Sequence, residues 1–368
     1  MLEDFFMPSS VAVIGAAREP GKVGHTILRN ILNSGYKGKI FPVNPKADAI
    51  LDLKCYPNIL KVPENVDLGV ITVPSFLVPQ VVEECGEKGI KSLVVISAGF
   101  KEIGPEGAAL ERQLLNASRK HKIRILGPNC LGIVDTYTPL NATFAAETPL
   151  RGNIAFISQS GALCIAVLDW SLTENIGFSR FVSLGNKSDL DEADFMQAIV
   201  DDPNTNVILV YIESVGNGEK FIKVAKQVTR KKPVIILKSG VSEAGARAAS
   251  SHTGALAGRD IAFETAFKQT GIIRARSIEE LFDLAETFST QPIPEGPNVV
   301  IITNAGGPGI LATDACDKYG LKLAPINSEL LKKLSSGLPP TASLHNPIDC
   351  IGDATPERYG FALSNVMD

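Results

Sequence analysis

Short apolar runs alternate with longer amphipathic stretches along most of this chain, and that alternation constrains its fold more than any other feature. Such runs are typical of buried parallel strands, and the stretches between them are typical of crossover helices. In the first third of the chain, the predicted strands are Ser10–Gly15, Lys39–Val43, Leu68–Val73, Ser92–Ser97 and Ile123–Leu126. The helices predicted between them include Val23–Asn33, Phe76–Lys88 and Glu106–His121. We therefore expect an α/β fold with parallel sheets, which begins with a doubly wound, Rossmann-like domain over residues 1–134.

The same alternation returns after a less regular segment, Asp135–Arg151. Strands are predicted at Asn153–Ile157, Phe178–Ser183, Asn206–Tyr211 and Pro233–Leu237, with a short one at Ile272–Ile273. Helices are predicted at Ala162–Glu174, Glu192–Val200, Glu219–Arg230, Ile261–Gln269 and Ile278–Phe288. The pattern indicates a second α/β domain, flavodoxin-like, over residues 150–290.

A linker is predicted at Ser289–Pro297, which holds three prolines and a glycine. A third series of elements follows it, with strands at Val299–Thr303 and Leu321–Leu323 and helices at Gly309–Lys318 and Ser328–Ser335. Residues 298–368 are 71 residues, whereas a complete doubly wound domain typically needs about 100 or more. We expect the start of a third, flavodoxin-like domain that is truncated or is completed by another chain.

Composition excludes several classes of partner. The net charge of −4 gives no bulk attraction to nucleic acid or to an anionic membrane, and no apolar run is long enough to span a bilayer. The acidic start, Met1–Pro8, is too short for a signal peptide. The six cysteines are scattered without a C-x-x-C pair and the four histidines are dispersed, which argues against a metal site and a disulfide framework. We expect a cytoplasmic protein with no metal site of its own.

The loop after the first strand has a glycine pattern longer than the dinucleotide fingerprint. Gly15, Gly21 and Gly24 precede a helix, so the loop can approach a phosphate at the helix N-terminus. A nicotinamide dehydrogenase would carry an acidic residue at the end of the second strand, but that strand is followed by Lys46, which suits a phosphate. The loop therefore favours a nucleotide-like ligand other than NAD, or it is only a tight strand-to-helix turn.

Three more strand ends are expected at the same edge of the first sheet. They are Thr72–Ser75, Ile96–Phe100 and Gly127–Gly132, which are rich in glycine and small polar residues. These segments suit a ligand cradle, although each can equally be a plain loop.

A histidine lies in a segment of small residues in the second domain. His252 is flanked by Ser, Ala, Gly and Thr over Ala244–Gly258, where its imidazole is poorly placed for a core and free to reach a reactive group. A carboxylate on the second ring nitrogen would fix the tautomer, and Glu213, after the strand Asn206–Tyr211, is the candidate. The alternative is a solvated loop histidine.

Two helix starts have the features of anion sites. Ser158–Ala162 begins the second domain, and Ser160 and Gly161 stand where backbone N–H groups bind anions. Asn304–Gly309 is a similar helix start in the third domain, where Gly306 and Gly307 offer backbone N–H groups. Pro308 suits a first helical turn. Together with His252, these starts can hold one phosphoryl group at different stages.

Four motifs in order resemble the ADP-forming acyl-CoA synthetases, relatives of succinyl-CoA synthetase, and in particular alpha subunits of the acetyl-CoA type. The motifs are SHTGALAG at Ser251–Gly258, GPNCLG at Gly127–Gly132, SQSG at Ser158–Gly161 and NPID at Asn346–Asp349. The resemblance covers nearly the whole chain. The short third domain departs from the family.

The resemblance implies a CoA-binding domain followed by ligase domains, and a reversible reaction in which acyl-CoA, ADP and phosphate give acid, ATP and CoA. His252 would carry the phosphoryl group, Glu213 would support it, and Ser160 and Gly161 would bind phosphate. The residues that would contact CoA are Gly15, Ala16, Gly21, Gly24, Lys46, Val73, Pro74, Ser75, Ser97, Ala98, Gly99 and Asn129. ADP or ATP with Mg²⁺ would bind an ATP-grasp beta subunit, in an α2β2 heterotetramer.

Two other functions compete with this one. A CoA-binding sensor would keep the first domain without phosphoryl transfer, but the presence of His252 favours the catalytic function. A nicotinamide-dependent oxidoreductase is disfavoured by the loop spacing and by Lys46.

Overall fold

The computed structural model describes residues 2–242, 244, 245, 247 and 260–367. It divides into two compact units, Met1–Gln291 and Pro292–Asp368. The boundary lies inside the proline-rich segment predicted as a linker. The predicted α/β fold with parallel sheets is confirmed.

The first sheet of the larger unit is parallel throughout, in the order β2-β1-β5-β6-β7. Its strands are β1 (Ser10–Ile14), β2 (Lys39–Val43), β5 (Leu68–Ile71), β6 (Ser92–Val95) and β7 (Arg124–Leu126). Apart from the exposed start of β2 and Arg124, these strand residues are buried, because helices cover both faces of the sheet. The chain reverses its winding between β1 and β5, which is where such folds bind ligands.

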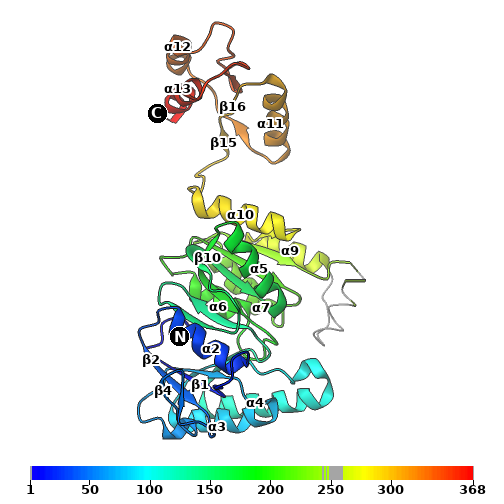
Figure 1. Cartoon of the computed structure of the whole chain (residues 1–368). Helices are drawn as coiled ribbons and strands as arrows, with labels where there is room; N and C mark the ends of the chain where they lie inside the picture. Colours follow the sequence, from blue (N-terminus) through cyan, green and yellow to red (C-terminus); the bar gives the residue numbers. More distant parts are fainter. Residues whose placement is uncertain (1, 243, 246, 248–259, 368) are drawn as a thin grey trace. The chain divides into compact units, whose positions relative to one another are not determined.

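Helices lie on both faces of this sheet (Figure 1). α2 (Val23–Asn33) buries Ile27, Leu28 and Ile31 against one face, while α3 (Val78–Lys88) and α4 (Pro105–His121) pack on the other. The remaining elements are α1 (Glu3–Phe6), the hairpin β3 (Ala49–Ile50) and β4 (Leu53–Lys54), and the 3₁₀ turns η1 (Ile59–Lys61), η2 (Ser75–Leu77) and η3 (Lys101–Ile103).

The second sheet has the order β14-β13-β12-β10-β11-β8-β9 among the described residues. Its parallel part consists of β10 (Leu150–Ser158), β11 (Gly177–Ser183), β12 (Val207–Ile212), β13 (Val234–Lys238) and β14 (Ile273–Ala275). Two antiparallel strands, β8 (Gly132–Asp135) and β9 (Leu140–Thr143), form its edge.

The edge strand β9 corrects the expectation that Asp135–Arg151 is irregular. All four residues of β9 are buried although Asn141 and Thr143 are polar, so no apolar run marks the strand in the sequence. The burial is possible because Asn141 Oδ1 accepts hydrogen bonds from the backbone N–H and the hydroxyl of Thr143.

Helices also cover both faces of the second sheet (Figure 1). α5 (Gly161–Thr173) and α10 (Ile278–Thr290) pack on one face, and α6 (Glu192–Ile199), α7 (Gly218–Val228) and α9 (Asp260–Thr270) on the other. The second core is continuous with that under α2, and the rings of Phe5 and Phe6 each lie 6.0 Å edge-to-face from Phe195. This shared core makes the two sheets one unit.

The smaller unit contains two strand pairs and three helices among its described residues. Its elements are β15 (Asn298–Val299), β16 (Ile302–Thr303), α11 (Gly306–Lys318), β17 (Lys322–Leu323), α12 (Ser328–Gly337), β18 (Ile348–Asp349) and α13 (Pro356–Met367). β15 pairs with β17, and β16 pairs with β18. The single strand predicted at Val299–Thr303 is interrupted because the Asn346 side chain donates to Val299 O at 2.8 Å and accepts from Ile301 N at 3.0 Å.

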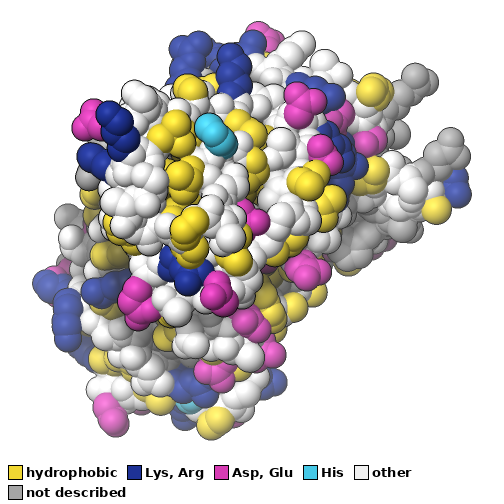
Figure 2. All heavy atoms as spheres, turned by 90° about the horizontal axis from the view of Figure 1, so that it is seen from above, with side chains coloured by type: hydrophobic (Ala, Val, Ile, Leu, Met, Phe, Trp, Pro, Cys, Tyr) yellow, Lys and Arg dark blue, Asp and Glu magenta, His cyan; other side chains and the backbone are white. Residues whose placement is uncertain are grey.

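Charges of both signs are dispersed on the face shown in Figure 2, with uncharged side chains between them. The six cysteines are all free and buried. In the part of the chain that the structure describes, no helix is both long and apolar enough to cross a membrane.

Candidate functional site

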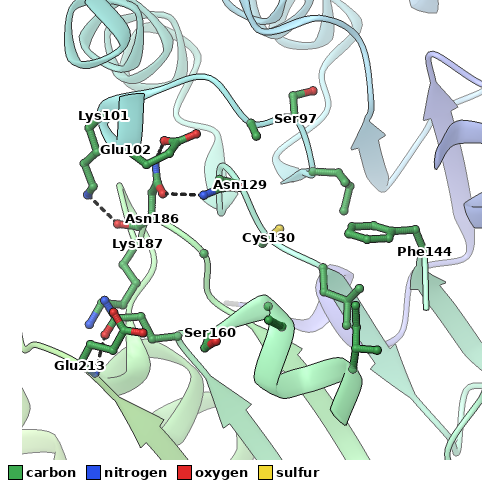
Figure 3. A pocket seen from close by; sticks show the side chains of 18 of the residues that line it. Ser97, Lys101, Glu102, Asn129, Cys130, Phe144, Ser160, Asn186, Lys187 and Glu213 are labelled. Carbon is green, nitrogen blue, oxygen red and sulfur yellow. Dashed lines mark hydrogen bonds between the residues drawn. The ribbon is translucent and has the colours of Figure 1, made fainter. Parts of the chain in front are cut away.

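A cavity of about 840 Å³ lies within the larger unit where the carboxyl ends of strands from both sheets meet (Figure 3). Loops after β6 and β7 line it from the first sheet, and loops after β10, β11 and β12 line it from the second. The predicted site residues among its walls are Ser97, Ala98, Asn129, Ser160, Gly161 and Glu213. Strand ends of parallel sheets are where ligands bind in such folds, and here two sets of them share one cavity.

The floor of the cavity is the start of α5. Ser160 is the N-cap, and its hydroxyl oxygen accepts a hydrogen bond from the backbone N–H of Leu163 at 3.3 Å. Gly161 has no side chain and lines the cavity together with Ala162, so the first-turn N–H groups lie at the cavity wall, apart from that of Leu163, which Ser160 caps. These N–H groups and the positive end of the helix dipole suit a phosphate.

Glu213 lies beside this helix start, immediately after β12. The side-chain oxygen of Gln159 accepts from the backbone N–H groups of Glu213 and Ser214, at 2.9 and 3.2 Å. The ammonium of Lys187 donates to Ser214 O at 2.6 Å and to Glu192 at 2.9 Å. The loop that carries Glu213 is therefore fixed from two directions.

Lys187 and Glu192 form a buried ion pair, with side-chain exposures of 7% and 1%. Burial raises the pKa of Glu192, and the adjacent Lys187 ammonium opposes that rise. Lys187 has a φ of +52°, and Gly185, two residues earlier, has a φ of +58°. A side chain at Gly185 would overlap Pro128 O, because its Cβ would lie 2.3 Å from that oxygen. The loop after β11 thus fits closely against the loop after β7.

Asn186 joins the two halves of the cavity (Figure 3). Its backbone N–H donates to Pro128 O at 2.9 Å, and its backbone oxygen accepts from Lys101 at 2.6 Å. Its side-chain nitrogen donates to Glu102 at 2.6 Å and to Glu111 at 3.0 Å. Its side-chain oxygen accepts from Asn129 at 3.3 Å. One residue of the second sheet therefore contacts loops after β6 and β7 of the first.

Glu102 transmits this contact to a predicted CoA loop. Its carboxylate accepts hydrogen bonds from the backbone N–H groups of Gly99 at 2.6 Å and Phe100 at 3.1 Å. Burial acts to raise the pKa of Glu102, but the hydrogen bonds from Asn186, Gly99 and Phe100 outweigh it, so the pKa lies below its ordinary value. Glu102 is therefore charged at neutral pH and holds the turn at Gly99.

The glycine loop of the first sheet lies next to the cavity, at the β1–β5 switch point. Gly15 has a φ of +98°, and Thr72 donates its hydroxyl to Gly15 O at 3.0 Å. A Cβ at Gly24 would lie 2.1 Å from Gly15 O, so the start of α2 contacts the backbone of the loop. Val23 and Thr72 line the cavity, and they directly precede the predicted CoA contacts Gly24 and Val73.

The other predicted CoA residues are placed at the same edge of the sheet without lining this cavity. Ala16 O accepts from the Asn44 side chain at 2.6 Å, and Asn44 accepts in turn from the backbone N–H of Lys46, which is exposed. Val73 O accepts from the Ser97 hydroxyl at 2.5 Å. The residues predicted to contact CoA that lie outside the cavity wall are Gly15, Ala16, Gly21, Gly24, Lys46, Val73, Pro74, Ser75 and Gly99.

Three family models match the chain in succession. A CoA binding domain matches residues 9–136, a succinyl-CoA ligase like flavodoxin domain matches 151–288, and a ligase-CoA domain matches 299–365. The acetate–CoA ligase [ADP-forming] I subunit alpha of Pyrococcus furiosus is 50% identical over 100% of this chain and 80% of that protein. This chain belongs to the family of ADP-forming acetate–CoA ligases.

Two further comparisons support this family. Acetate–CoA ligase [ADP-forming] I of Archaeoglobus fulgidus is 51% identical over 98% of this chain and 52% of that protein, so the chain spans about half the length of this relative. A solved structure of an acetyl-coenzyme A synthetase of Ca. Korarchaeum cryptofilum, in complex with phosphate and ADP, has a TM-score of 0.93. It is 46% identical, and the match covers 99% of this chain and 79% of that one.

Within this ADP-forming acetate–CoA ligase fold, the cavity lies between the two domains that the first models match. Ser97 and Asn129 come from the stretch that matches the CoA binding domain, and Ser160 and Glu213 come from the stretch that matches the flavodoxin-like domain. Both matched domains therefore contribute walls to this cavity.

Three of the predicted catalytic and phosphate-binding residues are not among the described residues that line this cavity. His252 and the rest of its motif lie outside the described residues. Gly306 and Gly307 begin α11 in the smaller unit, where an ideal Cβ on Gly306 would lie 3.7 Å from a carboxylate oxygen of Asp349. The Asp349 carboxylate already lies near that helix start.

The sequence prediction missed several residues of the cavity wall. They are Lys101, Glu102, Phe144, Gln159, Ile165, Asn186 and Lys187. Asn186 and Lys187 follow a predicted strand, as Glu213 does, so the same strand-end rule applied to Phe178–Ser183 would have found them. Among the described residues, no group of three or more His, Cys, Asp or Glu side chains could hold a metal ion.

Proposed function

We propose that this chain is the CoA-binding and phosphoryl-carrying part of a reversible ADP-forming acetyl-CoA synthetase, an acid–thiol ligase. One observation carries the proposal: the α5 start at Ser160 and Gly161 and the carboxylate of Glu213 share a cavity with Ser97 and Asn129 of the CoA-type domain. Ser160, Gly161 and Glu213 would bind and transfer the phosphate, and Ser97 and Asn129 would hold the CoA thioester that the phosphate attacks.

In the first step, a phosphate held at the α5 start attacks the thioester carbonyl carbon. The C–S bond breaks, CoA leaves as the thiol, and an acyl phosphate forms. The N–H groups of the first helical turn offset the phosphate charge. CoA itself binds along the β1–β5 edge, with Lys46 near its phosphates and Ser97, Ala98 and Asn129 near its thiol end.

In the second step, a ring nitrogen of His252 attacks the phosphorus, and the bond to the acyl oxygen breaks, so that the acid leaves. Glu213 accepts a hydrogen bond from the N–H of the other ring nitrogen and stabilises the developing positive charge on the imidazole. ADP then takes the phosphoryl group from the histidine to give ATP.

The chain acts with a second subunit in this proposal. ADP binds to an ATP-grasp beta subunit, where Mg²⁺ would neutralise the phosphate charge, and the assembly is an α2β2 heterotetramer. The support is that the Pyrococcus relative is named as an alpha subunit. We place the protein in the cytoplasm because its six cysteines are free.

Reconstitution tests the proposal. The purified chain is assayed for ATP with acetyl-CoA, ADP and phosphate, alone and with the beta subunit of an ADP-forming acetate–CoA ligase. We expect ATP only in the mixture. ATP from the chain alone would contradict the division between subunits, and CoA binding without ATP in either case would favour a sensor. Comparable NAD binding would favour an oxidoreductase.

A further inference from the structure

Lys187 lies in the wall of the cavity, and neither step of the proposed function uses it. Its side chain is 7% exposed and extends toward the loop that carries Glu213 (Figure 3). The ammonium donates to Ser214 O at 2.6 Å and to Glu192 Oε2 at 2.9 Å. Because burial of an ammonium is unfavourable unless it is paired, we looked for the reason for this lysine in what its contacts fix.

The backbone at Lys187 suits glycine better than lysine. Its φ of +52° lies in the left-handed region, which residues with a Cβ rarely adopt. The backbone N–H of Lys187 donates to Leu184 O at 3.3 Å, which closes the turn. A glycine would relieve the strain but would also remove the ammonium. Strain of this kind persists only where the surrounding structure imposes it, and it gathers at functional sites.

Glu192 keeps the ammonium in place. Its side chain is 1% exposed, and it is the first residue of α6, where the positive end of the helix dipole stabilises a carboxylate. A buried ion pair adds little to stability in general, and its best-attested role is to specify one arrangement of the chain. Here the arrangement that the pair specifies includes Ser214, because the same ammonium holds its carbonyl oxygen.

We propose that Lys187 is a positioning residue for phosphoryl transfer, which sets the place of the Glu213 carboxylate by holding Ser214 O. Gln159 holds the backbone N–H groups of Glu213 and Ser214, and Lys187 holds the carbonyl that follows them. Three successive peptide groups around Glu213 are therefore fixed by two side chains. This inference rests on the proposed function and adds a residue that acts through Glu213.

Removal of the ammonium should displace the carboxylate without touching the CoA contacts. The peptide group after Ser214 would lose its donor, so the loop could turn about the backbone next to Glu213. A misplacement of about 1 Å in a reacting group can slow a reaction about 10²-fold. We expect Lys187→Met to slow phosphoenzyme formation at least about tenfold and to leave CoA affinity unchanged.

A double-mutant cycle tests the inference. The full chain is combined with the beta subunit of an ADP-forming acetate–CoA ligase, and the rate of labelling from radioactive ATP is measured. Lys187→Met is compared with wild type and again in the Glu213→Gln background. We expect the slowing in the first comparison and little or none in the second, because the effects of residues that act as a unit do not add. The same factor in both backgrounds would overturn the inference.

A second variant and a matched control accompany the cycle. Lys187→Met leaves the Glu192 carboxylate buried without its partner, whereas Lys187→Met/Glu192→Met removes both charges, which is often neutral for stability. This double variant should slow labelling as Lys187→Met does. Arg180→Met is the control, because Arg180 is also a buried cation of the β11 segment, 3.1 Å from Asp135, but lies outside the cavity wall. It should label at the wild-type rate.

CoA titration separates the failures. A variant that binds CoA as wild type does is folded, because the two sheets share one core. If the wild-type complex takes up no label, the proposed function fails and this inference fails with it. If wild type is labelled but Lys187→Met/Glu192→Met is labelled equally fast, the inference alone is wrong. Equal slowing by Arg180→Met, or labelling of Glu213→Gln at the wild-type rate, would also overturn it.

Discussion

The side-chain oxygen of Gln159 accepts a hydrogen bond from the backbone N–H of Glu213 at 2.9 Å. Gln159 immediately precedes Ser160, the N-cap of α5, so the contact links the loop after β10 to the loop after β12. The proposed phosphate site and the proposed partner of the histidine are therefore held in a fixed relation by one amide.

Replacement of this amide tests its role. Gln159→Met keeps the length of the side chain but removes the acceptor, and leaves the N–H groups of Glu213 and Ser214 without their partner. We expect a loss of about 1–3 kcal/mol in the free energy of unfolding, measured with denaturant. Phosphoenzyme formation with the beta subunit should slow, while CoA affinity stays unchanged. Gln80→Met, at an exposed position of α3, is the control, and equal effects of the two changes would contradict the prediction.

Asn186 makes a second link, whose loss should depend on pH. In Asn186→Leu, Glu102 loses a hydrogen bond while its burial remains, so the pKa of Glu102 should rise. When the pKa of a carboxylate is lower in the folded protein than in the unfolded chain, the carboxylate stabilises the fold at a pH above its unfolded-state pKa. That stabilisation is lost as the pH falls through its folded-state pKa. The variant should therefore be less stable than wild type by about 1.5–3 kcal/mol at pH 7, and by less at about pH 3.

Denaturant unfolding at both pH values measures this difference. The matched background is Glu102→Gln, which cannot ionise. In that background, Asn186→Leu should have an effect that is less dependent on pH. A constant difference between Asn186→Leu and wild type from pH 7 to pH 3 would show that Glu102 is not the group concerned.

Strand ends were the part of the site that the sequence could predict. Ser97, Asn129, Ser160 and Glu213 each follow a recognisable apolar run, and the carboxyl ends of parallel strands meet at one edge. That rule needs no knowledge of how the two sheets pack. It locates these four residues of the cavity wall from the local pattern of apolar runs alone.

The contacts between the sheets could not be predicted in this way. Lys101 and Asn186 are 85 positions apart, and their hydrogen bond exists only because the loops after β6 and β11 are brought together by the shared core. Likewise, β9 was missed because Asn141 and Thr143 satisfy each other in a buried strand. Such pairings depend on tertiary structure, which hydrophobic periodicity does not encode.

The first domain should bind CoA in preference to NAD. Lys46 is exposed after β2, and Asn44 connects its backbone to Ala16 of the glycine loop. Lys46→Ala should weaken CoA binding by about 1–3 kcal/mol if the ammonium pairs with a phosphate. Lys39→Ala, at the amino end of the same strand, should have no effect. Calorimetric titration measures both, and NAD binding as tight as that of CoA would refute the assignment.

The last prediction concerns His252 as the phosphoryl carrier and Glu213 as its support. His252→Ala should abolish acid-labile, base-stable labelling from radioactive ATP in the complex with the beta subunit, and should leave CoA binding intact because the predicted CoA residues belong to the first domain. Glu213→Gln keeps the shape of the side chain but removes its charge, so transfer should slow by roughly 10²-fold or more.

The other histidines provide the controls. His121 is engaged by Glu83 at 2.7 Å, and His25 is buried with Nδ1 3.1 Å from Ala17 O, so neither is placed to carry a phosphoryl group. His121→Ala should therefore label normally. Label that persisted in His252→Ala, or that mapped to His25, His121 or His345, would assign the carrier elsewhere. Labelling could be lost in His252→Ala and yet proceed at an unchanged rate in Glu213→Gln. His252 would then remain the carrier, but its carboxylate partner would be another group. The reason is that Glu213→Gln removes the negative charge that would stabilise the imidazolium in the transition state, and should therefore slow the transfer if Glu213 is that partner.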